Sequence, residues 1–295
     1  MMARVSLGLM WLLHWLPFPL LGVVGRGFGA LLWAANRERR QSTLTNLRLC
    51  YPALADTERL ALAKAHFAAF AQTALERNLL WWSSPSRLKR LIRLEGLEHL
   101  RALQGQPVIL IAPHFVGLDM GWTRLALEQD MVTMYAKVKS PAFDAAIRRG
   151  RTRFGAQQLL SRQDGLRPTL AAIRSGKPFY YLPDLDYGPR DAVFVPFFGT
   201  PAATITALSR LARLTGAKVL PVVTRRDGKG YVTTIGAPWA DFPGSDGSKA
   251  DEGDARRMNA EIETAIEADG GRYRAQYLWS HKRFKTRPPG EKGVY

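Results

Sequence analysis

An alternation of apolar runs and helical patterns, beginning near residue 107, constrains the fold of this 295-residue chain more than any other feature. We expect strands at 107–112, 131–136, 178–182, 217–224 and 230–235, and helices near 118–128, 141–153, 165–175, 203–215 and 252–268. Strands that alternate with helices in this way are typical of parallel sheets with helices packed on their faces. The sequence therefore predicts an α/β protein with a mostly parallel central sheet flanked by helices.

The region before this alternation is helical and begins with an apolar stretch. The residues from Val5 to Val24 are nearly all apolar or small, which is about the length that spans a hydrocarbon core of ~30 Å. Pro17 and Pro19 would kink or break a straight span, so a tilted or partly re-entrant interfacial anchor is the alternative. We expect a membrane-anchoring helix at 1–36 and one domain at 37–295, made of a helical part (37–104) and an α/β body (105–295).

The charge of the chain restricts its partners. A formal net charge of +17 predicts an acidic partner or surface. No zinc-ligand spacing or RNA-binding motif accompanies the charge, so we expect no nucleic acid, and anionic lipid and an acidic carrier protein remain. Arg37, Arg39 and Arg40 follow the apolar stretch and only Arg4 precedes it, which predicts that the body lies on the cytoplasmic side.

A histidine follows the first expected strand of the body. The run Val108–Ile111 leads into Ala112-Pro113-His114-Phe115-Val116-Gly117-Leu118-Asp119, so His114 lies at the carboxyl end of a strand, where open α/β sheets bind ligands. Asp119 lies one turn into the next helix and could reach back to fix the tautomer of the imidazole and stabilise its charged form. A histidine held in this way is a general base for a hydroxyl. Because no serine lies in a G-x-S-x-G elbow, we expect direct attack and no acyl-serine.

A second block makes this interpretation specific. Pro183-Asp184-Leu185-Asp186-Tyr187-Gly188-Pro189-Arg190, together with the His114 block, 46–52 and 279–288, resembles the lipid A late acyltransferases, within the wider H-x4-D/E glycerolipid acyltransferase group. The resemblance covers nearly the whole chain. It implies an inner-membrane enzyme that moves a fatty acyl chain from acyl carrier protein to a hydroxyl of a lipid A precursor. It implies no cofactor, with the acyl carrier thioester as co-substrate. Acyl carrier protein and the lipid A precursor are both acidic, which suits the net charge of +17 of this chain.

The resemblance also implies substrate-binding residues. Arg151 matches the family's functional arginine and Asp184 its functional aspartate. We interpret Arg151, with Arg153, as a contact to phosphate or carrier, although cations at a helix end are also typical of solvated surface. Asp184 would organise the site, and Asp186 would share its face if both lie on a strand; Arg190 closes the block as a further candidate. Two carboxylates could bind Mg²⁺, but no phosphoryl-transfer motif accompanies them, so we expect no metal.

Two other functions share parts of these features. An acyltransferase of another glycolipid or of a lysophospholipid would share His114 and Asp119, but the 183–190 block argues against it. A non-catalytic basic protein that docks on anionic membranes would need no paired histidine and aspartate.

Overall fold

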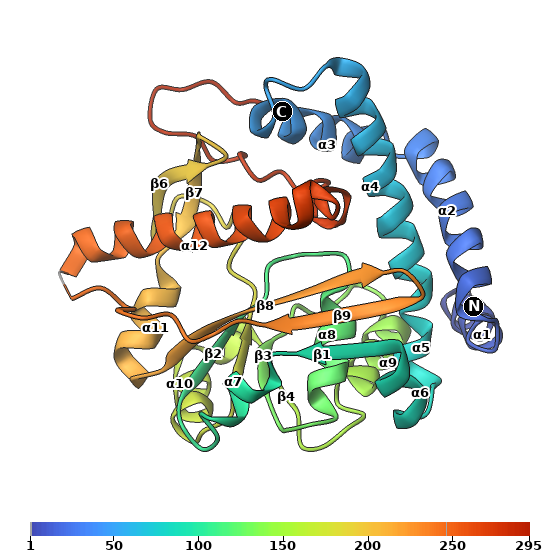
Figure 1. Ribbon diagram of the computed structural model, residues 1–295, viewed down its shortest axis with the longest axis horizontal. Coiled ribbons are helices and arrows are strands. Elements are labelled where there is room, and N and C mark those ends of the chain that lie inside the picture. Colours follow the sequence, from blue (N-terminus) through green and yellow to red (C-terminus); the bar gives the residue numbers. More distant parts are fainter. Residues whose placement is uncertain (1, 246) are drawn as a thin grey trace.

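A seven-stranded sheet forms the centre of the computed structural model, which describes residues 2–245 and 247–295 (Figure 1). The strand order is β1-β9-β8-β2-β5-β3-β4. The strands are β1 (Ile92–Glu95), β2 (Val108–Ile111), β3 (Val132–Met134), β4 (Gln158–Leu160), β5 (Phe179–Tyr181), β8 (Lys218–Asp227) and β9 (Gly230–Ile235). Neighbouring strands run parallel except β8 and β9, which form an antiparallel hairpin. The predicted α/β class and mostly parallel sheet are confirmed.

The central strand β2 is buried on both faces, which explains its unbroken apolar sequence. Val108 and Leu110 pack in one cluster with residues of α7 (Leu97–Arg101) and α8 (Leu118–Ala126). Ile109 and Ile111 pack in another with residues of α10 (Arg167–Arg174), α11 (Ala207–Thr215) and α12 (Gly247–Gly271). Successive strand residues point to opposite faces, so β2 joins two helical layers.

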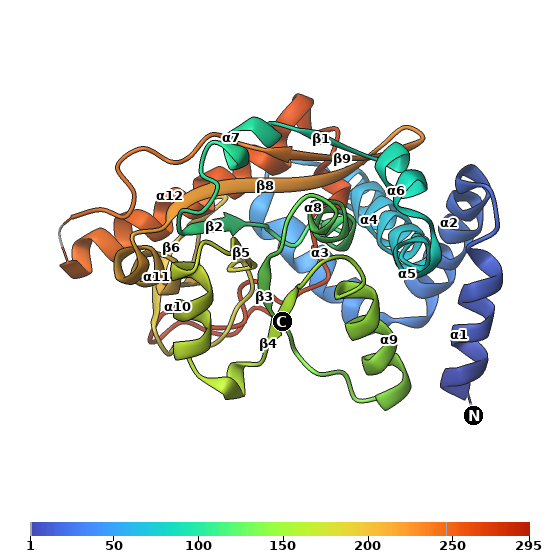
Figure 2. The ribbon, with the colours of Figure 1, turned by 90° about the horizontal axis from the view of Figure 1, so that it is seen from below.

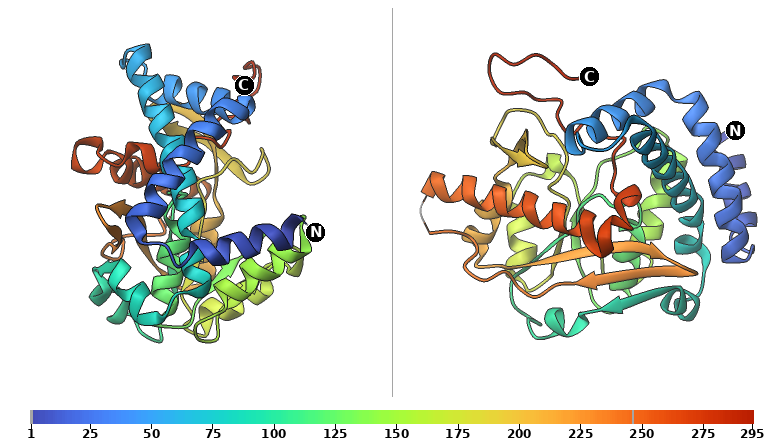
Figure 3. Two further views of the ribbon diagram at one scale, coloured as in Figure 1. Left: turned by 90° about the vertical axis from the view of Figure 1, so that its right-hand side faces the viewer. Right: turned by 45° about the horizontal axis from the view of Figure 1, so that its top comes forward.

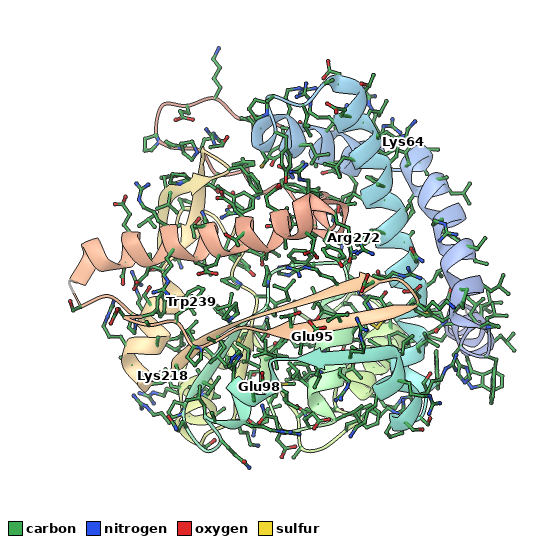
Figure 4. The ribbon with its side chains drawn as sticks, in the orientation of Figure 1. Lys64, Glu95, Glu98, Lys218, Trp239 and Arg272 are labelled. Atoms are coloured by element: carbon green, nitrogen blue, oxygen red, sulfur yellow. The ribbon has the colours of Figure 1, made fainter. Side chains whose placement is uncertain are left out.

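Several charged side chains lie on the outer surface. Glu95 at the end of the edge strand β1, Glu98 on α7 and Lys218 at the start of β8 are all exposed (Figure 4).

The part expected to be wholly helical, 37–104, also contributes to the sheet. It contains α3 (Arg37–Cys50), α4 (Asp56–Glu76), α5 (Asn78–Trp82), α6 (Pro85–Leu91) and α7, but Ile92–Glu95 forms β1, parallel to β9. The basic residues around this short segment follow a helical pattern, whereas its pairing with β9 depends on residues far along the chain. A boundary at residue 104 therefore cuts through the sheet.

A second, two-stranded sheet was not expected from the sequence. β6 (Ala192–Phe197) and β7 (Thr200–Ile205) form an antiparallel hairpin, and α11 starts only at Ala207, later than the expected 203. Phe198 and Gly199 connect the strands with φ of 48° and 77°. Consecutive positive φ values match the right-handed twist of the strands in a two-residue hairpin turn.

The N-terminal apolar stretch is divided into two helices, α1 (Met2–Leu13) and α2 (Phe18–Ala35), as the prolines predicted (Figure 3). Pro17 precedes α2 and Pro19 lies in its first turn, where a missing N–H costs nothing. α2 is the one described helix that is long and apolar enough to cross a membrane. It packs on α4 so closely that a Cβ atom on Gly25 would lie 2.4 Å from Cα of Gln72.

Candidate active site

Figure 2 shows β2 and α8. The loop that joins them begins at the carboxyl end of β2 and carries His114. Phe115, 1% exposed, anchors the loop in the core, and Gly117 precedes α8. A Cβ atom at Gly117 would lie 2.9 Å from the carbonyl oxygen of Thr224, so the close approach of the loop to β8 requires glycine there. The loop therefore has little freedom, and the position of His114 is set by the core.

Asp184 is the carboxylate that holds His114. Its Oδ1 lies 2.6 Å from His114 Nδ1, and its Oδ2 accepts the backbone N–H of His114 at 2.8 Å. Asp184 follows β5, the neighbour of β2, and its side chain is 1% exposed. Because Nδ1 donates to the carboxylate, the neutral imidazole carries its proton there and leaves Nε2 as the basic nitrogen.

The ionisation of Asp184 suits this role. Burial alone would raise the pKa of Asp184, but the charge of His114 and its hydrogen bonds outweigh burial and lower this pKa. Tyr277 lies against the same carboxylate, and burial followed by the negative charge of Asp184 raises the pKa of the Tyr277 hydroxyl. The site thus pairs a fixed carboxylate with a histidine, and a tyrosine stays protonated beside them.

The prediction that Asp119 contacts the imidazole of His114 is wrong. Asp119 Oδ1 accepts from Arg151 Nη2 at 2.6 Å, and its Oδ2 lies 2.9 Å from Arg77 Nε. Burial opposes the charged form, but the two guanidinium groups prevail and lower the pKa of Asp119 to about 2. The spacing of five residues would allow Asp119 to contact His114, but both carboxylate oxygens of Asp119 contact arginines instead. A catalytic role for Asp119 stays a prediction.

Arg151 contacts Asp119, whereas Arg153 does not contact the same carboxylate, and a substrate-binding role for either arginine stays a prediction. The end of α9 (Pro141–Arg151) is fixed by Trp122, whose Nε1 donates to the carbonyl of Arg151 at 3.0 Å. The Arg151 guanidinium lies over the ring of Tyr135, 5.6 Å from its centroid. Arg153 instead donates to the carbonyl of Leu80 at 3.1 Å. Arg153 therefore ties α9 to α5.

Arg77 is a site residue that the sequence analysis did not identify. It lies between α4 and α5, in a stretch that reads only as amphipathic helix, and no motif marks it. Its side chain is 38% exposed while its Nε contacts Asp119. Its contribution depends on the ion pair that brings the α4–α5 junction to the start of α8, which no local pattern reports.

Asp186 links the 183–190 block to the C-terminal segment. Its carboxylate accepts from the backbone N–H and the hydroxyl of Thr286 at 2.7 and 2.8 Å, and from the backbone N–H of Gly188 at 2.9 Å. β5 ends at Tyr181, so Asp184 and Asp186 lie in a loop, and the shared-face argument does not hold. Arg190 is exposed at the end of this loop. Within the described residues, no group of three or more His, Cys, Asp or Glu side chains is arranged to hold a metal.

The C-terminal segment also clamps the His114 loop. Leu278 N–H donates to the carbonyl of His114 at 2.9 Å, and Val116 N–H donates to the carbonyl of Gln276 at 2.8 Å. Phe115 and Tyr277 form an antiparallel bridge between these bonds. His281, the first residue of a basic run at 281–287, lies beside the site, where its Nε2 accepts from the N–H of Asp186 at 3.1 Å.

The family model and the sequence relatives agree on one family. Residues 2–286 match the family described as bacterial lipid A biosynthesis acyltransferase. The chain is 33% identical to the lipid A biosynthesis lauroyltransferase of Escherichia coli K12, over 99% of this chain and 94% of that protein. It is 34% identical to the lipid A biosynthesis myristoyltransferase of the same strain, over 92% of this chain and 82% of that protein. A solved 1-acyl-sn-glycerophosphate acyltransferase from Thermotoga maritima is similar at 15% identity and a TM-score of 0.37, over 88% of this chain and 98% of that one.

Proposed function

Because the chain belongs to the bacterial lipid A biosynthesis acyltransferase family, we propose that it moves a fatty acyl chain from acyl carrier protein to a hydroxyl of a lipid A precursor, with His114 as general base. The observation that carries the base assignment is the pair of contacts from Asp184 to His114, which leaves Nε2 unprotonated in the neutral ring. His114 is partly exposed, with 15% of its side chain accessible, so the imidazole is not sealed inside the core.

The proposed step runs through direct attack. His114 Nε2 takes the proton of the acceptor hydroxyl as its oxygen bonds to the thioester carbonyl carbon. The carbon–sulfur bond then breaks, and the imidazolium returns the proton to the departing thiolate, which leaves an ester and a free carrier thiol. Asp184 stabilises the imidazolium between the two transfers, because it remains ionised in contact with Nδ1.

The arginines beside Asp119 would bind the phosphate of a substrate. Arg151 and Arg77 each contact Asp119, so two cations share one anion and positive charge remains beside His114. A guanidinium has five donors, and the contact of each to Asp119 uses only one nitrogen. Lipid A precursors and the prosthetic arm of acyl carrier protein both offer phosphate. Asp119 would hold the two guanidinium groups in place for it.

The chain is also proposed to act on the cytoplasmic side of the inner membrane. Large apolar side chains project from both N-terminal helices, among them Leu12 on α1 (56% exposed) and Leu31 on α2 (64% exposed). Exposed apolar surface on adjacent helices suits a lipid environment. Arg37 follows α2, and the net charge of +17 favours both an anionic membrane surface and an acidic carrier.

The test is acyl transfer by the purified full-length protein. Acyl carrier thioester and a phosphorylated lipid A precursor are supplied, and mass spectrometry follows the gain of one acyl chain; a lysophospholipid acceptor tests the alternative. We expect the wild type to acylate the lipid A precursor and His114→Ala to lose about 10²–10⁴-fold in rate. His99→Ala is the matched control, since His99 lies on α7 and its Nδ1 contacts the carbonyl of Ile235 at 3.0 Å. Transfer only to the lysophospholipid, or full activity of His114→Ala, would contradict the proposal.

A further inference from the structure

His281 is attached rigidly to the His114 loop. The Leu278 N–H that bonds the carbonyl of His114 belongs to a turn in which the N–H of His281 donates to the carbonyl of Leu278 at 3.2 Å. Asn46 Nδ2 donates to the carbonyls of Trp279 and His281 at 2.7 and 2.5 Å. The backbone of His281 is therefore held by α3 on one side and by the His114 loop on the other.

The hydrogen bond from Asp186 determines the tautomer of His281. Since Nε2 accepts the N–H of Asp186, the neutral ring carries its proton on Nδ1. Burial, followed by the positive charge of His114, lowers the pKa of His281 to about 4. The ring is therefore neutral throughout the physiological range, even when His114 is charged. Among the described residues, no protein group accepts from Nδ1 of His281.

The reaction needs a hydrogen-bond donor, and three backbone N–H groups of the His114 loop are already engaged. Negative charge develops on the thioester oxygen during attack, and enzymes stabilise it with preorganised N–H or O–H groups. The backbone N–H groups of His114, Phe115 and Val116 already donate to Asp184, Pro113 and Gln276. The carboxylates of Asp119 and Asp184 can only accept.

We propose that His281 Nδ1–H donates a hydrogen bond to the carbonyl oxygen of the acyl thioester as negative charge develops there. This assignment rests on the proposed function and adds a residue to the same site. His281 lies close enough to His114 for their charges to interact, and both rings are held by the 184–186 loop, through Asp184 and Asp186. A neutral donor beside a histidine that becomes charged avoids the repulsion that a second imidazolium would suffer.

Two isosteric substitutions separate this role from a structural one. The amide of asparagine lies two bonds from Cβ, like Nδ1 of histidine, so His281→Asn keeps a donor there and loses the contact to Asp186. The amide of glutamine lies three bonds from Cβ, like Nε2, so His281→Gln keeps an acceptor for the Asp186 N–H and loses the donor. We expect His281→Gln to lower kcat about 10²–10³-fold with little change in KM, and His281→Asn to stay within about tenfold of wild type.

The measurements are steady-state kinetics with acyl carrier thioester, pH profiles of kcat, and thermal unfolding by circular dichroism. The pH profile of His281→Gln should keep the wild-type shape, because His281 does not titrate near neutrality. Activity of His281→Gln near wild type, or equal losses in the two variants, would overturn the donor role. Absence of transfer by the wild type in the same assay would instead overturn the proposed function.

Discussion

Replacement of Asp184 by asparagine tests the central contact of the site. Asparagine keeps the shape of the side chain but removes its charge and one of its two acceptors. In the structure both oxygens of Asp184 accept, one from Nδ1 and one from the backbone N–H of His114. An amide can satisfy only one of these donors. If its NH₂ group faces Nδ1, the proton of the imidazole moves to Nε2, and the ring can no longer accept the proton of the acceptor hydroxyl.

The expected loss is large in activity and moderate in stability. Removal of the carboxylate from a comparable histidine pair lowers turnover by ~10⁴, and each factor of ten corresponds to about 1.4 kcal/mol of activation free energy. We therefore expect Asp184→Asn to reduce kcat/KM about 10³–10⁴-fold, or about 4–5.5 kcal/mol. The donor left without an acceptor in this buried position should cost about 1–3 kcal/mol of the free energy of unfolding.

The assay is acyl transfer at substrate concentrations below KM, together with urea unfolding of each variant. Asp130→Asn is the matched control, since Asp130 precedes β3 at the amino edge of the sheet and accepts the N–H of Ala156 at 2.7 Å. It should retain wild-type activity. If folded Asp184→Asn keeps more than about a tenth of wild-type turnover, the carboxylate does not orient the base, and the mechanism built on it fails.

Three further results are expected. Asp119→Asn should lower the free energy of unfolding by about 2 kcal/mol at pH 7, because the pKa of Asp119 falls from 3.8 to about 2 on folding. The difference in stability between wild type and variant, measured by urea unfolding, should shrink as the pH drops from about 4 towards 2. A difference that does not depend on pH would contradict this expectation. With acyl carrier protein as donor, kcat/KM should fall steeply as ionic strength rises, whereas with acyl-CoA it should change little. The reason is that the net charge of +17 attracts an acidic carrier over a screening length of ~10 Å at 0.1 M salt. Equal salt dependence with the two donors would contradict an electrostatic attraction to the carrier. Gly25→Val should separate α2 from α4 and lower the unfolding temperature, because a Cβ atom there would meet the backbone of Gln72 at 2.4 Å. Gly27→Val should leave the unfolding temperature unchanged, because nothing lies within 4 Å of a Cβ atom at that position.

The sheet was predictable where its strands form apolar runs or, like β9, alternate regularly between buried and half-buried residues. β2, β5 and β8 are largely apolar runs bounded by helical patterns, so a local window of sequence identifies them. β1 and β4 lie at the edges of the sheet, and each is short and only partly buried. Their sequence patterns therefore cannot be distinguished from those of a helix or a loop. The β6–β7 hairpin depends on a turn at Phe198-Gly199, and phenylalanine at positive φ is not a turn signal.

The sequence by itself determined the class of sheet, the division of the apolar N-terminus at its prolines, and the position of His114 at the carboxyl end of a strand. Each of these follows from interactions between residues close in the chain. Only the tertiary structure decided the partner of His114. Asp119 is five residues away but is held by two arginines, whereas Asp184 is seventy residues away and meets the imidazole at 2.6 Å because β5 lies beside β2. Hydrogen bonds are short and directional, so the order of strands in the sheet, not the distance along the chain, selects the carboxylate.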